Sequence, residues 1–293
     1  MPFTPGAVLL TLSASLSYGS FDAVRKKLAN TLQPLPLTAL LGLGQALFFA
    51  VWTLSSGATL PLPGYLPQAA ASITFSLVGN LLFMRALQVS PLSLTIPFLS
   101  FSPVFTALFS GALLGEFPRS IQALGIAWVV LGAFLLNLAK EDLASPTHFL
   151  RGVTRERGCL LMLGAALVWA LGSIFDKRAL VYASVPLHAL VQSLGIALAI
   201  LFLLLLRRDV GSLGNVRHCR GLYAVAIVVA SLAQGLQLLA LPLVVVSLYE
   251  AIKRCIGMTL AVINGALFFG EPVTPRKLLS IALMGTGVVF ILA

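Results

Sequence analysis

Three charged residues stand inside an otherwise apolar stretch at 246–269, namely Glu250, Lys253 and Arg254. Their spacing of i, i+3 and i+4 puts all three on one face of a helix. Arg254 lies about eight residues into this stretch, which at 1.5 Å per residue is roughly 12 Å deep. A charge at membrane depth costs at least about 2.5–3.5 kcal/mol, so such residues usually face an interior or a cavity and have a partner. We interpret the three as a ligand-binding cluster; the alternative is a structural ion pair.

Other charges inside apolar stretches fall into two groups. Asp22 and Arg25 lie near the end of the first stretch, and Arg85 lies near the end of the third. Asp176 and Lys177 lie near the end of the sixth. Counting membrane crossings places the first group on one side and the second, with Glu250, Lys253 and Arg254, on the other. We expect gating or coupling charges at Asp22, Arg25, Arg85, Asp176 and Lys177, and substrate-binding side chains between the layers at Tyr18, Asn80, Trp169, Gln234 and Gln237.

The composition requires a membrane for the whole chain. Of 293 residues 59% are hydrophobic and 10% are charged, whereas an average soluble protein carries about 25% charged residues. We therefore predict an all-α polytopic membrane protein with ten transmembrane helices of about 20 residues. The predicted spans are 6–28, 35–56, 65–88, 92–114, 118–138, 158–182, 186–207, 220–242, 246–269 and 273–292.

The two halves of the chain repeat each other. The segment Ser110–Pro118 near the end of the first half resembles Asn264–Pro272 near the end of the second. The Gly-Glu pairs of the two segments are 155 residues apart. Each half has five spans, an odd number, so the second copy is inverted relative to the first, as in alternating-access transporters. We divide the chain into repeats at 1–138 and 158–293 with a polar linker at 139–157. Glu116 and Glu271, each close to a helix start, are expected to serve the exposed N–H groups there.

The sequence resembles the EamA-type branch of the drug/metabolite transporter superfamily. The resemblance rests on the pairs Tyr18-Gly19 and Trp169-Ala170, the Ser- and Pro-rich segment Ser90–Pro97 with Pro103, the segment Tyr249–Arg254 and the two Gly-Glu endings. It implies ten helices in two halves and small-molecule transport, often efflux of amino acids, metabolites or drugs. Tyr18 departs from the family pattern, which usually has Trp there.

Loop charges predict the orientation. Nineteen Lys and Arg face nine Asp and Glu. Fourteen of the basic residues lie at odd-numbered loops and three at even-numbered loops, which indicates that the odd loops are cytoplasmic and both termini outside. We expect the inner membrane of a bacterium, with the lipid bilayer and a small-molecule substrate as partners. Basic stretches interleaved with aromatic residues are absent, so we expect no nucleic-acid partner.

These observations predict a secondary transporter, by the resemblance an exporter, of amino acids or related carboxylates. The in-span charges are six bases against three acids, which favours a substrate that bears a carboxylate or phosphate. We expect no cofactor, metal or catalytic residue, and a coupled proton or a counter-substrate. We interpret the three cysteines as packing residues. We expect His188 and His218 to lie at the membrane interface, and we find no histidine placed as an obvious proton relay. Two alternatives remain, a multidrug or cation efflux transporter and a membrane-embedded enzyme acting on a phosphorylated lipid.

Overall fold

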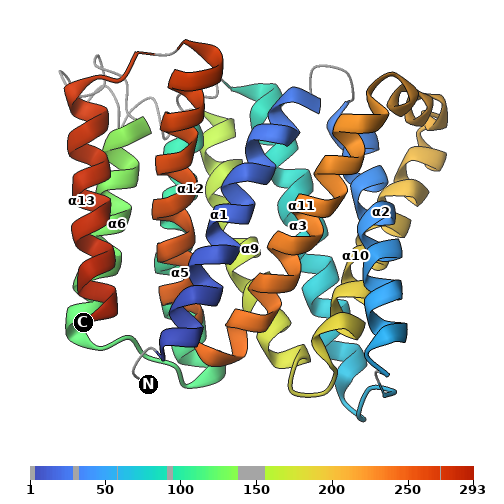
Figure 1. Ribbon diagram of the computed structural model, residues 1–293, viewed down its shortest axis with the longest axis horizontal. Helices are drawn as coiled ribbons and strands as arrows, with labels where there is room; N and C mark the ends of the chain where they lie inside the picture. The colour runs from blue at the N-terminus through green and yellow to red at the C-terminus, as the bar shows by residue number, and fades with distance from the viewer. Residues whose placement is uncertain (1–3, 29–32, 58, 91–94, 138–155, 271) are drawn as a thin grey trace. The chain divides into compact units, whose positions relative to one another are not determined.

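The computed structural model describes residues 4–28, 33–57, 59–90, 95–137, 156–270 and 272–293. Within these ranges the chain forms ten helical spans and no β-strand (Figure 1). The spans are α1 (Pro5–Leu28), α2 (Pro34–Ser55), α3 (Tyr65–Val89), η1 (Ile96–Phe101) continued by α5 (Ser102–Leu114), α6 (Ser120–Asn137), α9 (Arg157–Ala179), α10 (Val185–Leu206), α11 (Arg220–Ala240) continued by η3 (Leu241–Leu243), α12 (Val246–Phe269) and α13 (Pro275–Leu292). A further 3₁₀ segment, η2 (Val210–Cys219), joins α10 to α11. The predicted fold class is confirmed, with each span beginning and ending within a few residues of its expected limits.

Apolar residues cover both the inner and the outer sides of most helices. On α2, Phe49 is buried while Leu54 is 82% exposed. A helix that is hydrophobic all round belongs in a membrane, where its outer side meets lipid. Eight described helices are long and apolar enough to cross a bilayer. The remaining two spans are α6, which is shorter, and α12, which carries the three charged residues.

Contacts divide the chain into two compact units that cut across the sequence halves. Unit 1 comprises Val78–Ile174 and Val244–Ala293, and unit 2 comprises Pro2–Leu77 and Phe175–Leu243. The divisions fall inside α3 and α9. Each unit therefore contains helices from both halves of the sequence. Most of the expected linker at 139–157 lies outside the described residues, which resume at residue 156.

Unit 1 is built around the pair α6 and α13, the last helices of the two halves (Figure 1). A Cβ atom on Gly125 would come within 2.5 Å of the Gly287 carbonyl oxygen, and one on Gly132 within 2.8 Å of the Ser280 carbonyl oxygen. Positions 125 and 280 are 155 residues apart, and so are positions 132 and 287. The two Gly-Glu pairs have the same separation. The close approach of the two backbones thus occurs twice. The earlier glycine of α6 meets the later position of α13, so the two helices are antiparallel.

The Gly-Glu segments have the same backbone conformation at their glycine where both can be compared. Gly115 ends α5 with φ 67° and Gly270 ends α12 with φ 65°. Glycine adopts this left-handed conformation without steric cost, so it terminates a helix where other residues would be strained. The repeat is therefore present in the backbone as well as in the sequence.

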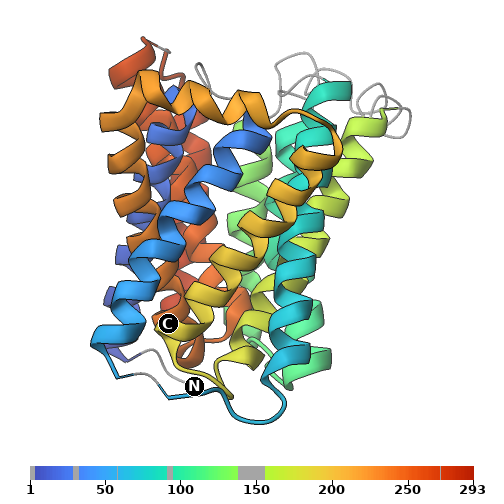
Figure 2. The same ribbon diagram turned by 90° about the vertical axis from the view of Figure 1, so that its right-hand side faces the viewer.

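Unit 2 pairs α2 with α10 and α1 with α11 (Figures 1 and 2). Ala39 of α2 packs with Ile200 and Leu204 of α10. Leu28 of α1 packs with Ala226 of α11. The segment η2 runs across the end of this unit between α10 and α11 (Figure 2). These pairs hold α10 and α11 so that their polar residues meet those of α3 and α9.

Candidate functional sites

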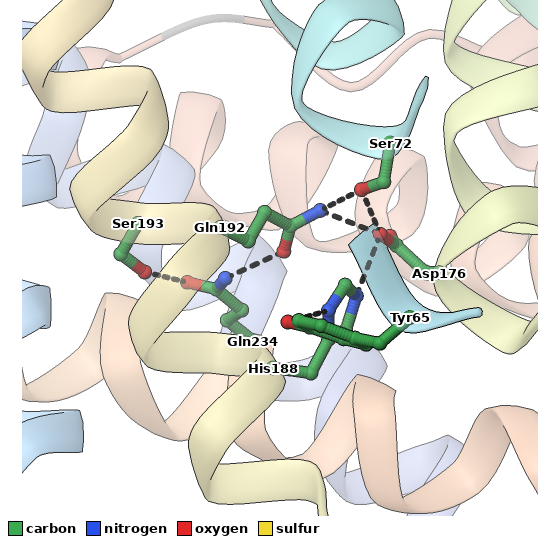
Figure 3. Close-up of polar contacts among 7 residues, drawn as sticks. All are labelled: Tyr65, Ser72, Asp176, His188, Gln192, Ser193 and Gln234. Atoms are coloured by element: carbon green, nitrogen blue, oxygen red, sulfur yellow. Dashed lines mark hydrogen bonds and ion pairs between the residues drawn. The ribbon is translucent and has the colours of Figure 1, made fainter. Parts of the chain in front are cut away.

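Asp176 is the centre of a buried polar cluster in unit 2 (Figure 3). This residue of α9 is 4% exposed. Its Oδ1 accepts hydrogen bonds from Ser72 Oγ of α3 and from Gln192 Nε2 of α10, the latter at 2.6 Å. His188 Nε2 of α10 lies 3.2 Å from the same oxygen. Three donors around one buried oxygen are what an ionised carboxylate requires away from water.

His188 connects this carboxylate to Tyr65. The imidazole is fully buried, and its Nδ1 lies 3.1 Å from the Tyr65 hydroxyl oxygen. The two rings meet edge to face, 5.8 Å apart. With Asp176 ionised, Nε2 carries the hydrogen that faces the carboxylate, so in the neutral imidazole Nδ1 accepts from Tyr65; this tautomer follows from the network. The three residues come from α9, α10 and α3.

Amide side chains extend the cluster across unit 2. Gln45 Nε2 of α2 donates to Gln234 Oε1 at 2.8 Å, and Gln234 Nε2 donates to Gln192 Oε1 at 2.8 Å. Gln192 Nε2 then donates to Asp176 and to Ser72. Ser193 Oγ also donates to Gln234 Oε1, at 3.2 Å. All three amides point their donor end toward the carboxylate, and such aligned hydrogen bonds strengthen one another.

A second charged cluster lies in unit 1 around Glu250 of α12. Glu250 is 4% exposed, and its Oε1 accepts from Lys253 Nζ at 2.7 Å and from Ser173 Oγ at 3.1 Å. Ser102 Oγ lies 3.5 Å from Oε2. Lys253 also lies over the Tyr249 ring, at 5.3 Å from its centroid. The lysine side chain is 25% exposed and that of the glutamate 5%, so the cation forms the accessible end of the pair.

Glu116 lies between α5 and α6 in the sequence, but its side chain lies at the start of α12. Its Oε2 accepts the backbone N–H of Val246, the first residue of α12, at 3.3 Å. A carboxylate there meets the exposed N–H groups and the positive end of the helix dipole. The repeat counterpart, Glu271, lies outside the described residues.

Several of the other residues singled out from the sequence make contacts outside these two clusters. Trp169 packs against Phe83, with ring centroids 5.4 Å apart, and against Gly79, all in unit 1. Asp22 and Arg25 form an ion pair at 2.9 Å whose side chains are about half exposed. Arg85 is exposed and donates to Gln88. The remaining expected residues are half-buried in the case of Tyr18, Asn80, Lys177 and Arg254, and buried in the case of Gln237. Of the expected residues, unit 2 joins Asp176 with Gln234 through Gln192, and unit 1 joins Glu250 with Lys253.

Sequence reasoning gave His188 no partner, whereas the structure shows it fully buried beside Asp176. It also missed Ser72, Gln192 and Tyr65 as partners of Asp176. One signal was available, because His188 and Gln192 stand four residues apart and so share one face of the apolar α10. Polar residues one turn apart in a membrane helix indicate a common interior partner. Among the described residues, no group of three His, Cys, Asp or Glu is placed to hold a metal ion.

The sequence matches the EamA-like transporter family twice, over residues 5–138 and 156–293. The chain belongs to the EamA-like transporter family. Within it, the chain is 27% identical over 299 residues to the threonine/homoserine exporter RhtA of Escherichia coli K12. That match covers 94% of this chain and 87% of RhtA, and the RhtA of E. coli O157:H7 matches equally.

A solved crystal structure has the same fold, with a TM-score of 0.77 over 98% of both chains at 17% identity. Membership of the transporter family and the apolar helices together make the protein an integral membrane protein, and the family implies the membrane and a small-molecule substrate as partners. Family membership points to transport rather than catalysis.

Proposed function

We propose that this chain is a secondary transporter that exports amino acids or related small carboxylates by alternating access. The observation that supports the substrate class is the charged cluster of α12. A zwitterionic substrate needs a cation to bind its carboxylate and an anion to bind its ammonium group. Lys253 and Glu250 supply these two charges, and their charged atoms lie 2.7 Å apart. The exposed end is the lysine, so a substrate carboxylate meets a cation first, while the deeper Glu250 can accept the ammonium group.

Arg254 is the second cation of this cluster in our proposal. It follows Lys253 directly and lies four residues after Glu250, half-buried on the same helix. A guanidinium binds a carboxylate through two parallel hydrogen bonds, which a lysine cannot do. We assign it the selection of the substrate carboxylate.

The relatives support amino acids as the substrate class and export as the direction. RhtA is a threonine/homoserine exporter by name, and it matches nearly the whole of this chain. At 27% identity we propose amino acids as the substrate class of this chain and do not assign which amino acid is exported. We place the protein in a bacterial inner membrane with its odd-numbered loops in the cytoplasm, on the basis of the loop charges.

Counterflow into proteoliposomes tests the proposal. Vesicles that hold purified protein and unlabelled threonine or homoserine should take up the same labelled amino acid from outside, and Arg254→Gln should abolish this uptake. Arg254→Lys should restore it only in part. Arg178→Gln is the matched control, since Arg178 lies over the Phe175 ring near the end of α9 and should transport normally. Normal transport by Arg254→Gln, or transport confined to permanently cationic drugs, would contradict the assignment and favour the multidrug alternative.

A further inference from the structure

We propose that one end of unit 2 binds the head group of an anionic phospholipid. The binding surface, here named the basic end, is formed by η2, by Arg207 and Arg208 at the end of α10 and by Arg220 at the start of α11. All three arginine side chains are exposed. The inference goes beyond the proposed function, because it concerns a lipid that the protein binds and does not transport.

The segment η2 covers this end of the unit with its apolar side. It is a 3₁₀ helix of ten residues, and because such a helix has three residues per turn, residues three apart lie above one another. Leu213 packs against the cluster of α2 and α10, and Val216 and Cys219 pack against the cluster of α1, α2 and α11. A Cβ on Gly211 or Gly214 would meet nothing within 4 Å. The segment therefore lies across the helix ends and leaves its glycines on the open side (Figure 2).

The basic end carries an excess of positive charge. The segments 22–34 and 207–220 contain the connections from α1 to α2 and from α10 to α11, and together they hold seven Lys and Arg against two Asp. One of the two acids, Asp22, already forms an ion pair with Arg25 at 2.9 Å. Basic residues that border membrane helices attract the anionic head groups of the adjacent leaflet.

Exposed apolar side chains lie directly before the two arginines of α10. Phe202, Leu205 and Leu206 are 60–67% exposed, as expected of residues that contact lipid tails. Arg207 and Arg208 follow them, so the surface of the helix changes from apolar to cationic within one turn. A phospholipid has the same order of acyl chain and phosphate at this depth. This order favours a lipid over a free anion or an acidic protein, neither of which would contact the apolar side chains.

Arg208 keeps its side chain in a backbone conformation that favours glycine. Its φ is 55°, and the other described residues with positive φ are four glycines. The N–H groups of Arg208 and Asp209 donate to the carbonyl oxygens of Leu205 and Leu204, each at 3.0 Å, which is how a left-handed residue ends a helix. Glycine would end α10 here without the steric cost of a Cβ. We infer that the arginine side chain has a role that glycine could not fill.

Lipid titration of the purified, delipidated protein tests the proposal. Phosphatidylglycerol should raise the unfolding temperature in neutral detergent more than phosphatidylcholine with the same acyl chains does. A basic residue near an anionic surface contributes about a fivefold change in affinity, so the double variant Arg207→Gln/Arg208→Gln should need roughly 30-fold more phosphatidylglycerol for half-maximal stabilisation.

The matched control removes two arginines outside the basic end, namely Arg119, which is exposed between α5 and α6, and Arg178 near the end of α9. The variant Arg119→Gln/Arg178→Gln should keep the native affinity for phosphatidylglycerol. An equal loss in this control would overturn the proposal, because the effect would then follow from net charge alone. Equal stabilisation by the two lipids, or full stabilisation by inorganic phosphate without lipid, would also overturn it.

Two variants of Arg208 separate lipid binding from folding. Arg208→Gly removes the charge and suits the backbone, so in phosphatidylcholine it should be at least as stable as the native protein. Its affinity for phosphatidylglycerol should nevertheless fall about fivefold. Arg208→Lys keeps the charge and should keep most of the affinity. Native affinity in Arg208→Gly, or a loss in Arg208→Lys as large as that in Arg208→Gly, would show that the cation does not bind the lipid.

Discussion

Lys253 Nζ lies 2.7 Å from Oε1 of Glu250, one turn earlier on α12. Hydroxyl groups of two other helices also contact the glutamate, namely Ser173 of α9 and Ser102 of α5. Breaking a buried ion pair from one side leaves the other charge without its partner, which costs about 3–5 kcal/mol.

We expect Glu250→Gln and Lys253→Met each to lower the thermal stability of the purified protein, and the double variant to lose less than the two single losses combined. The reason is that the double variant removes both members of the ion pair, so that neither charge is left without the other. Thermal unfolding in detergent measures all three, and a coupling of roughly 0.5–3 kcal/mol is expected for side chains in contact. Strictly additive losses would show that the pair contributes no coupling.

Glu116→Ala should destabilise the protein by about 1 kcal/mol, because the N–H of Val246 loses its carboxylate acceptor at the start of α12. Glu116→Gln should lose less, since an amide oxygen still accepts although the charge is gone. Thermal unfolding distinguishes the three proteins. An alanine variant as stable as the native protein would mean that water replaces the acceptor at no cost.

The close approach of α6 and α13 makes Gly287 intolerant of a side chain. A Cβ there would come within 2.7 Å of the Gly125 carbonyl oxygen, so Gly287→Ala should cost about 1–3 kcal/mol. Gly285→Ala, two residues earlier on the same helix, is the matched control because a Cβ there meets nothing within 4 Å. It should leave stability unchanged or raise it by up to about 1 kcal/mol, the helix preference of alanine. Equal effects at both positions would contradict the packing described for this pair.

A reporter fused after Ala293 should lie outside the cytoplasm. The expectation rests on the excess of Lys and Arg at odd-numbered loops. Paired fusions, to alkaline phosphatase and to a fluorescent protein that matures only in the cytoplasm, measure it from both sides. A fluorescent C-terminus would place the basic loops outside and invert our assignment.

The fold followed from the sequence because its signals are local. Apolar runs of membrane length and the Gly-Glu repeat predicted the spans to within a few residues, and the glycine at each of the two endings adopts the same conformation. Hydropathy reports a property of the segment itself, so it does not depend on which helix becomes the neighbour.

The candidate sites followed less well because their partners are distant in sequence. Asp176 was expected to matter, yet its contact with Ser72 spans 104 positions and pairs α9 with α3. Glu116 was expected at a helix start, and the helix proved to be α12, 130 positions away. Periodicity tells which residues share a face of a helix and does not tell what that face meets.

The pairing of α6 with α13 also has a bearing on how the protein is made. The ribosome adds roughly 140 residues between these helices, which at about 5–20 residues per second takes some seven to thirty seconds. During that interval Gly125 and Gly132 lie in the bilayer without the carbonyl groups of α13 that later cover them. Unit 1 therefore gains α13 only after its other helices have been inserted in the lipid, and its central helix pair assembles among them.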